Sequence, residues 1–355
     1  MPRSSTPHRG TASNPGGRFE RHTNEAFDDG WWQDDDLPPL RTTVAEDSTR
    51  TIIARNDSPD IGFDRSINPY RGCEHGCTYC FARPSHSYLG LSPGLDFETR
   101  LFAKPNAPAL LEAELRNPRY RCQPIAIGTN TDPYQPIERQ RRIMRGILEV
   151  LAAYRHPVSI TTKSALVARD IDVLAPMAAQ GLASVMISVT TLDRDLARRL
   201  EPRAAVPSQR LAAIGALSAA GIPTAVNVAP VIPALTDHEM ETILAEAAQR
   251  GATGAGWILV RLPYEVKDLF DDWLAQHAPG RRDHVLSLLR QSRRGRLNDP
   301  SFGGRFRGEG PYADLLAQRF RIAISRLGLT GASRPPLRCD LFTRPPRPGD
   351  QMKLF

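Results

Sequence analysis

Residues 68–80, NPYRGCEHGCTYC, carry the strongest structural signal in the chain. This stretch overlaps the end of a short β-rich run, residues 66–70, and places Cys73, Cys77 and Cys80 within eight positions. Thiols this close together can act on one metal centre, and iron–sulfur clusters are held by cysteine thiolates. A four-iron cluster with three protein ligands leaves one iron open to a small molecule. The stretch therefore predicts a reactive metal centre directly after a strand.

A zinc site is the alternative for the same cysteines. Together with His75 or His86 they make a Cys3His set, which is common at structural zinc sites. Such sites more often pair two C-x2-C-type knuckles, and no second knuckle follows in the sequence. Under this interpretation the chain is a zinc-stabilised module that binds nucleic acid or a protein partner without catalysis. The identity of the metal separates the two hypotheses.

Around this stretch, short apolar runs alternate with longer amphipathic segments. The alternation predicts parallel βαβ units. The expected strands are residues 66–70, 124–128, 158–162, 183–189, 224–229 and 256–261. The expected helices between them include residues 138–154, 168–180, 208–220 and 237–250. Six units fall short of the eight in a closed barrel, so we predict an α/β fold with a partial (β/α)6 TIM-like barrel. The loops after its strands should line the site.

The two ends of the chain have a different composition. The N-terminal segment is rich in Ser, Thr, Gly, Pro, Asn and Asp, which is typical of a disordered tail. Beyond the barrel, residues 281–294 and 312–327 are expected to be helices, and a proline-rich run follows them. The predicted division is a disordered tail at 1–50, the barrel at 51–278, a helical extension at 279–343 and an extended tail at 344–355.

Composition limits the possible partners. A chain of 355 residues with 41% hydrophobic residues can bury a large core, and its formal charge of +7 favours contact with a polyanion. Residues 281–307 contain eight arginines against two aspartates. This segment could bind phosphates or simply be a solvated face. With no apolar signal region and no run of about 18 apolar residues, we expect a cytoplasmic protein that does not enter a membrane.

The CxxxCxxC spacing, with Tyr79 as an aromatic residue before the last cysteine, resembles the signature of radical S-adenosylmethionine (SAM) enzymes. The resemblance implies a [4Fe-4S] cluster on Cys73, Cys77 and Cys80, with SAM chelating the open iron and Tyr79 near the adenine. An external electron donor of the flavodoxin or ferredoxin type would then drive cleavage of SAM. The resulting 5'-deoxyadenosyl radical would abstract hydrogen from a substrate.

Polar residues after the second and third expected strands, and on the fourth, resemble the spore photoproduct lyase branch of that family. By this resemblance Thr131 and Asp132 would hold the amino or ribose groups of SAM, Lys163 its carboxylate or ribose, and Ser188 its ribose. Opposite charges on Lys163 and the carboxylate, and on Asp132 and the ammonium, would form charge-assisted bonds.

One position departs from the lyase pattern. Thr129 stands where the lyase carries its hydrogen-donor cysteine, so we do not assign thymine-dimer repair. Cys122 is expected to be a buried small residue rather than a substitute donor. DNA or another nucleic acid is the predicted substrate class, and RNA, a peptide or a small metabolite is the alternative. Glu201 and Arg203 are expected either to function in the site or to form a structural ion pair.

The sequence ends in QMKLF, which resembles the short peptide by which bacterial DNA polymerases and repair proteins dock on the sliding clamp. Gln351, Leu354 and Phe355 would be its anchors. The alternative is a tail that folds back and buries the two apolar residues on the barrel.

Overall fold

The computed structural model describes residues 9–20, 40–331 and 336–346. Its main sheet has seven strands in the order β10-β9-β8-β7-β6-β3-β2. They are β2 (Ala54–Arg55), β3 (Arg65–Ile67), β6 (Ile125–Ile127), β7 (Val158–Thr162), β8 (Ala183–Val189), β9 (Thr224–Val231) and β10 (Gly254–Leu259). All neighbours pair in parallel except β2, which runs antiparallel to β3 at one edge. The predicted α/β fold with a partial barrel of six parallel strands is confirmed.

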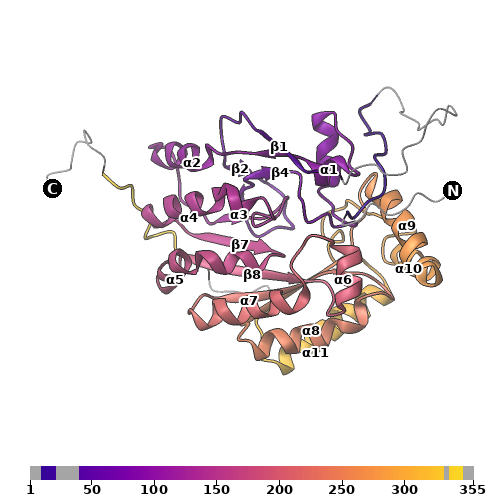
Figure 1. Cartoon of the computed structure of the whole chain (residues 1–355). Helices are drawn as coiled ribbons and strands as arrows, with labels where there is room; N and C mark the ends of the chain where they lie inside the picture. The colour runs from indigo at the N-terminus through magenta and orange to yellow at the C-terminus, as the bar shows by residue number, and fades with distance from the viewer. Residues whose placement is uncertain (1–8, 21–39, 332–335, 347–355) are drawn as a thin grey trace.

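Helices cover the outer face of this sheet and follow one another in chain order (Figure 1). They are α4 (Ile143–Ala153), α5 (Ile171–Ala179), α7 (Pro207–Ala219) and α8 (Met240–Gln249). The helix expected at 138–154 is interrupted, because Arg142 has a φ of 51° and separates α3 (Glu138–Arg141) from α4. The Glu138 carboxylate accepts the amides of Ile143 and Met144, which replaces the hydrogen bonds lost at the break.

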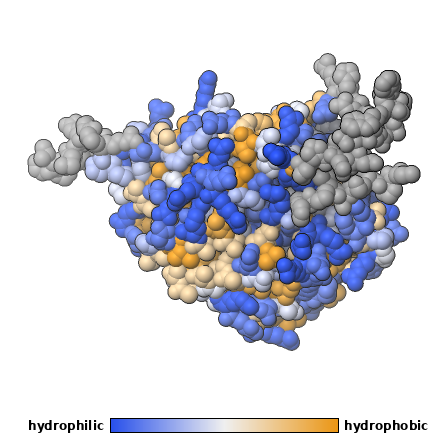
Figure 2. Space-filling model, viewed as in Figure 1, coloured by the Kyte–Doolittle hydropathy of each residue, from blue (hydrophilic) through white to orange (hydrophobic). Residues whose placement is uncertain are grey.

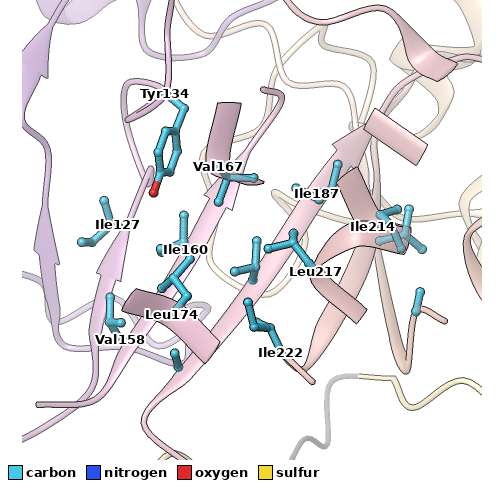
Figure 3. Packing of buried hydrophobic residues seen from close by; sticks show 14 of the residues in the cluster. Ile127, Tyr134, Val158, Ile160, Val167, Leu174, Ile187, Ile214, Leu217 and Ile222 are labelled. Atoms are coloured by element: carbon cyan, nitrogen blue, oxygen red, sulfur yellow. The ribbon is translucent and has the colours of Figure 1, made fainter. Parts of the chain in front are cut away.

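The core lies between the strands and these helices, and alternation along each strand decides what faces it. Ile127, Ile160 and Ile187 are fully buried against helix residues such as Leu174 and Leu217 (Figure 3). Successive residues of a strand face opposite sides. The neighbours of these isoleucines therefore face the inside of the barrel.

The inner face becomes polar toward the carboxyl ends of the strands. Ser188 pairs with Asn227, and Asn227 pairs with Gly256, so three neighbouring strands present one row. A Cβ on Gly256 would lie 3.2 Å from the Asn227 side-chain oxygen. Glycine at this position keeps the inside of the barrel open above the row.

Three helices complete the far end of the chain: α9 (Val266–His277), α10 (Pro279–Gln291) and α11 (Pro311–Arg326). The helices predicted at 281–294 and 312–327 correspond to α10 and α11. Neither α9 nor α6 (Arg194–Leu200) was predicted, although the buried positions of α9 recur at helical spacing. No described helix combines the length and apolar character that a membrane span needs. On the face in Figure 2, hydrophilic residues predominate.

A second, three-stranded sheet lies beside the barrel. It joins β1 (Thr43–Glu46), β5 (Arg100–Ala103) and β4 (Tyr70–Arg71). Three short helical segments adjoin it in the sequence: η1 (Arg83–Leu89), α1 (Asp96–Thr99) and α2 (Ala107–Arg116). Composition could not predict β1, since its partner β5 is more than fifty residues away in the sequence.

Part of the segment expected to be a disordered tail therefore has a defined position. Besides β1, residues 9–20 lie against the region around Glu98, whose carboxylate accepts the amides of Gly10 and Thr11 at 2.9 and 3.2 Å. A Cβ on Gly10 would lie 1.7 Å from the Gly76 carbonyl oxygen, so only glycine fits there. A buried carboxylate needs several donors, and this segment supplies three of them, the two amides and the Thr11 hydroxyl at 3.2 Å.

The last described segment, residues 336–346, packs at the amino ends of the strands. The amide of Thr343 donates to the Tyr154 carbonyl at 3.0 Å, and the Phe342 ring contacts His156. The clamp-binding residues Gln351, Leu354 and Phe355 lie outside the described residues, so that hypothesis stays a prediction. The predicted domain boundaries also stay predictions.

His156 should make stability fall in acid. Burial lowers the pKa of His156 from 6.5 to about 4, and its Nε2 lies 2.7 Å from the Tyr120 hydroxyl. Above pH 6.5 the neutral ring contributes fully; as pH falls toward 4, the unfolded state binds the proton first. Between pH 7 and pH 4.5 this costs about 2–3 kcal/mol. Urea unfolding should show a smaller loss in His156→Gln, and equal losses would refute the assignment.

Candidate functional site

The three cysteines lie in one loop, residues 72–80, which we call the cluster loop. Cys73 and Cys77 are buried and Cys80 is half-buried. The loop is held by its backbone: the Cys73 amide donates to the Phe97 carbonyl at 2.9 Å, and the Thr78 amide to the Leu200 carbonyl at 3.1 Å. These contacts fix the loop at the carboxyl edge of the barrel, where the polar inner row ends.

A buried arginine also anchors the cluster loop. Arg83 is fully buried and donates to the carbonyls of Gly76 and Cys77 at 3.0 and 2.8 Å. Its charge is paired with Glu98, which the N-terminal segment contacts as well. A fixed guanidinium with several carbonyl acceptors is a rigid support. Sequence analysis missed it, because Arg83 follows the motif in an unremarkable polar stretch.

The thiols would need help to ionise. Burial raises the pKa of Cys73, Cys77 and Cys80, in Cys73 and Cys77 with the neighbouring acidic groups adding to the effect. The positive charge of Lys163 opposes the shift at Cys77 and Cys80. A bound metal centre would supply the remaining stabilisation, because metal-bound thiols are deprotonated.

Asp132 joins the loops that follow β6 and β7. One oxygen, Oδ1, accepts the Thr162 hydroxyl at 2.6 Å and the Tyr134 amide at 2.9 Å; the other, Oδ2, accepts the Lys163 amide at 2.7 Å. His75 of the cluster loop lies 3.5 Å from Oδ2. A carboxylate has about four acceptor positions, so Asp132 keeps one for a ligand beside His75. These hydrogen bonds mainly hold the loop that carries Lys163 against the cluster loop.

Lys163 and Tyr79 lie together. The Lys163 ammonium is 5.9 Å from the centroid of the Tyr79 ring, and it has no hydrogen bond or ion pair within the described residues. Lys163 follows β7, whose last paired residue Thr162 matches Ile187 of β8. Extending that register by one residue places Lys163 beside Ser188. A free cation, an aromatic ring and a polar strand residue thus adjoin the cysteines.

A buried ion pair supports Tyr79 from below. The Tyr79 hydroxyl donates to Glu201, which is paired with Arg210 and lies 2.7 Å from the Thr190 hydroxyl. Burial alone would raise the pKa of Glu201, but Arg210 and Lys163 outweigh it and lower that pKa to about 2. Glu201 is therefore charged, and its ion-pair partner is Arg210 rather than Arg203.

Arg203 has a different partner. It lies 3.1 Å from Glu74 of the cluster loop. Sequence analysis considered Glu201 and Arg203 together because they are close in the chain, and it did not pair Glu201 with Arg210. The missed signal was a lone arginine among the buried positions of α7.

Two threonines and one cysteine complete the predicted set. The Thr131 hydroxyl donates to the Tyr70 carbonyl at 2.8 Å, so Thr131 ties its loop to β4. Thr129 lies in the same loop, and its hydroxyl accepts from Asn68 at 3.3 Å. Cys122 is half-buried just before β6, at the amino edge, and its thiol contacts Cys339. It lies at the opposite end of the strands from the cluster loop.

The donor set fits an iron–sulfur cluster. Three thiols in one backbone-anchored loop have the right chemistry, and the free Lys163 cation beside them suits an anionic cofactor group. Among the described residues, no three His, Cys, Asp or Glu side chains lie close enough together to hold a single metal ion. Of the histidines considered as zinc ligands, His86 has its Nε2 2.9 Å from the Arg100 carbonyl oxygen, while its Nδ1 is buried without a hydrogen-bond partner among the described residues.

Comparisons with known sequences identify one family. The family model of the Radical SAM superfamily matches residues 67–247. An uncharacterized protein of Mycobacterium tuberculosis, Rv2578c, is 40% identical over 278 residues, which cover 78% of each chain. An uncharacterized protein of Methanocaldococcus jannaschii, MJ0683, is 29% identical over 49% of this chain and 62% of its own.

Solved structures show the same fold. A structure titled spore photoproduct lyase complexed with dinucleoside spore photoproduct superimposes with a TM-score of 0.58 and 18% sequence identity. The superposition covers 81% of this chain and 80% of the lyase chain. A mutant of that lyase with bound AdoMet gives a TM-score of 0.59 at 17% identity, with the same coverage.

Proposed function

Since the chain belongs to the radical SAM superfamily, we propose that Cys73, Cys77 and Cys80 hold its [4Fe-4S] cluster and that SAM binds beside them. When bound, these cofactors supply one-electron cleavage of SAM to methionine and a 5'-deoxyadenosyl radical, which takes a hydrogen atom from the substrate. The observation that carries the proposal is the cluster loop itself, with three anchored cysteines facing a free lysine.

The chain's own residues bind and orient SAM in this proposal. Lys163 pairs with the carboxylate, and the remaining acceptor position of Asp132 takes a donor of SAM, its ammonium or ribose. Tyr79 presents its ring to the adenine, held in place by Glu201. Ser188, in the polar inner row, reaches the ribose. Thr131 positions the loop that carries Asp132.

Removing the lysine charge should weaken SAM binding. We expect Lys163→Ala to raise the Kd for SAM about 10-fold to 100-fold, the usual loss for a hydrogen bond to a charged group. Lys163→Arg should recover part of the affinity. Isothermal titration calorimetry of the reconstituted protein measures the Kd for SAM. Lys267→Ala, on the exposed face of α9, removes the same charge elsewhere and should leave the Kd unchanged. Equal effects of the two alanine variants would remove Lys163 from the site.

Electron paramagnetic resonance tests the proposal directly. The protein is reconstituted anaerobically with iron and sulfide, reduced with dithionite and frozen with and without SAM. We expect the signal of a reduced four-iron cluster, altered by SAM because SAM occupies the open iron. A spectrum that is indifferent to SAM would count against the proposal. An external donor of the flavodoxin or ferredoxin type would replace dithionite in the cell.

The fate of the substrate radical differs from that in the lyase. The residue at the donor position, Thr129, has no abstractable thiol hydrogen, and Cys122 lies at the opposite edge of the barrel. We therefore propose that hydrogen return does not pass through a cysteine of the loop after β6. Thymine-dimer repair by that route is not part of the proposal.

A further inference from the structure

In the part of the chain that the structure describes, large exposed aromatic side chains gather near the cluster loop. Within the described residues the large exposed aromatics are Phe19, Phe81, Tyr88, Tyr264 and Phe302, with exposed fractions between 46% and 72%. Burying large apolar rings is favourable, and so a cluster of exposed ones marks a binding surface. We call these five rings, with Arg18, Arg261 and Arg305, the mouth surface.

An arginine accompanies every one of these rings. The Arg18 guanidinium lies 4.9, 5.2 and 4.1 Å from the ring centroids of Phe19, Tyr88 and Tyr264. Arg261 lies 5.5 Å from that of Phe81, and Arg305 lies 5.0 Å from that of Phe302. Alternating rings and guanidinium groups combine stacking faces with positive charge.

Two segments hold this surface next to the proposed radical site. Phe81 directly follows Cys80, and Tyr88 lies on η1 a few residues later. Arg261 and Tyr264 lie in the loop after β10, at the carboxyl edge. The Arg18 group and the Arg261 group each span these two segments. Arg305 adjoins the Arg261 group through Phe306, whose ring centroid lies 4.9 Å from Arg261 and 4.8 Å from Arg305. A ligand on the mouth surface would therefore be close to the cluster loop.

Two of the arginines lack partners for their charge. In the described part of the chain, no hydrogen bond or ion pair involves the guanidinium of Arg18 or Arg261, and Arg18 Nη1 and Arg261 Nε are buried without an acceptor. Arg305 is paired with Asp60. Among the described residues, the carboxylate of Glu265 accepts only the backbone amide of Arg18, and its Oε2 is buried without a donor. Buried donors without acceptors indicate that a ligand brings them, and phosphate oxygens suit arginine best.

We propose that the mouth surface binds single-stranded nucleic acid, with bases stacked on Phe81 and Tyr264 and phosphates on Arg18 and Arg261. Single strands are the form that fits, because a base inside a duplex cannot offer its face to a side chain. Residues 281–307 add only part of their formal charge to this attraction, because Arg293 is buried and Arg282, Arg294 and Arg305 are paired with carboxylates. Only the further step, that the bound strand is the substrate, rests on the proposed function.

Fluorescence anisotropy of the full-length reconstituted protein with labelled single-stranded DNA and RNA tests the proposal. We expect Tyr264→Ala and Arg261→Gln each to raise the Kd about 5-fold to 100-fold, and added salt to weaken binding. Leu315→Ala and Arg321→Gln, on α11, are the controls for an exposed apolar side chain and for charge, and should bind like the wild type.

Three outcomes would overturn it: no binding, equal losses in the controls, or a duplex bound as tightly as the single strand. Loss of binding to poly-glutamate in the two variants, with oligonucleotide binding unchanged, would instead assign the surface to a peptide. Failure of the wild type to cleave SAM while it binds oligonucleotides normally would overturn the proposed function alone. Normal SAM cleavage without oligonucleotide binding would overturn only this inference.

Discussion

Cys77→Ala is expected to reduce the release of 5'-deoxyadenosine to the background of the assay. Cys77 packs in an apolar cluster with Tyr79 and Leu200, so alanine should be tolerated by the fold while one cluster ligand is lost. Two thiolates are too few to hold a four-iron cluster that also needs an open iron. The same loss is expected for Cys73→Ala and Cys80→Ala. Iron content and chromatography of the products measure the effect.

Cys122→Ala is the matched control for this experiment. It removes a thiol from the same barrel, but at the amino edge, where Cys122 contacts Cys339. It should keep both iron and activity. If Cys77→Ala kept its iron and its activity while folding normally, the cluster would not depend on this loop, and the proposed ligand set would fail.

Glu201→Gln is expected to destabilise the protein by about 3–5 kcal/mol, because it leaves the Arg210 charge buried without its partner. Arg210→Met should cost a similar amount by stranding Glu201. The double variant should lose much less than the sum, since neither partner is then left as an unpaired buried charge. Denaturant unfolding of the cluster-free protein measures all three.

Acid should act on the same pair. The pKa of Glu201 is lowered to about 2, below its ordinary value of 4.5, so the contribution of this carboxylate to the free energy of unfolding is complete above pH 4.5 and declines as pH falls toward 2.

The control for the Arg210→Met substitution is Arg203→Gln, because Arg203 is paired with Glu74 and is more exposed. If Arg203→Gln cost as much as Arg210→Met, the buried pair would not be the main support of Tyr79.

The strands could be predicted from sequence because their signal is local. The runs at 158–162 and 183–189 coincide with β7 and β8, since buried parallel strands are continuous β-branched and apolar runs. For the same reason, the cysteine spacing predicted that the three thiols lie in one loop, residues 72–80. Sequence patterns that span only a few residues can be interpreted without any knowledge of the fold.

Features that depend on distant partners could not be predicted. The order at residues 9–20 depends on Glu98, and the position of Arg83 depends on carbonyls that only the folded loop brings together. The break at Arg142 depends on a carboxylate that caps the next helix. Glu201 was noticed, but its partner Arg210 became evident only once α7 lay beside β8.

The most direct test of the account is the SAM cleavage reaction of the wild-type protein. Purified anaerobically, reconstituted with iron and sulfide, and given dithionite and SAM, it should be brown and should release 5'-deoxyadenosine and methionine. A colourless protein that carries zinc on the cysteines and leaves SAM intact would contradict the account at its centre.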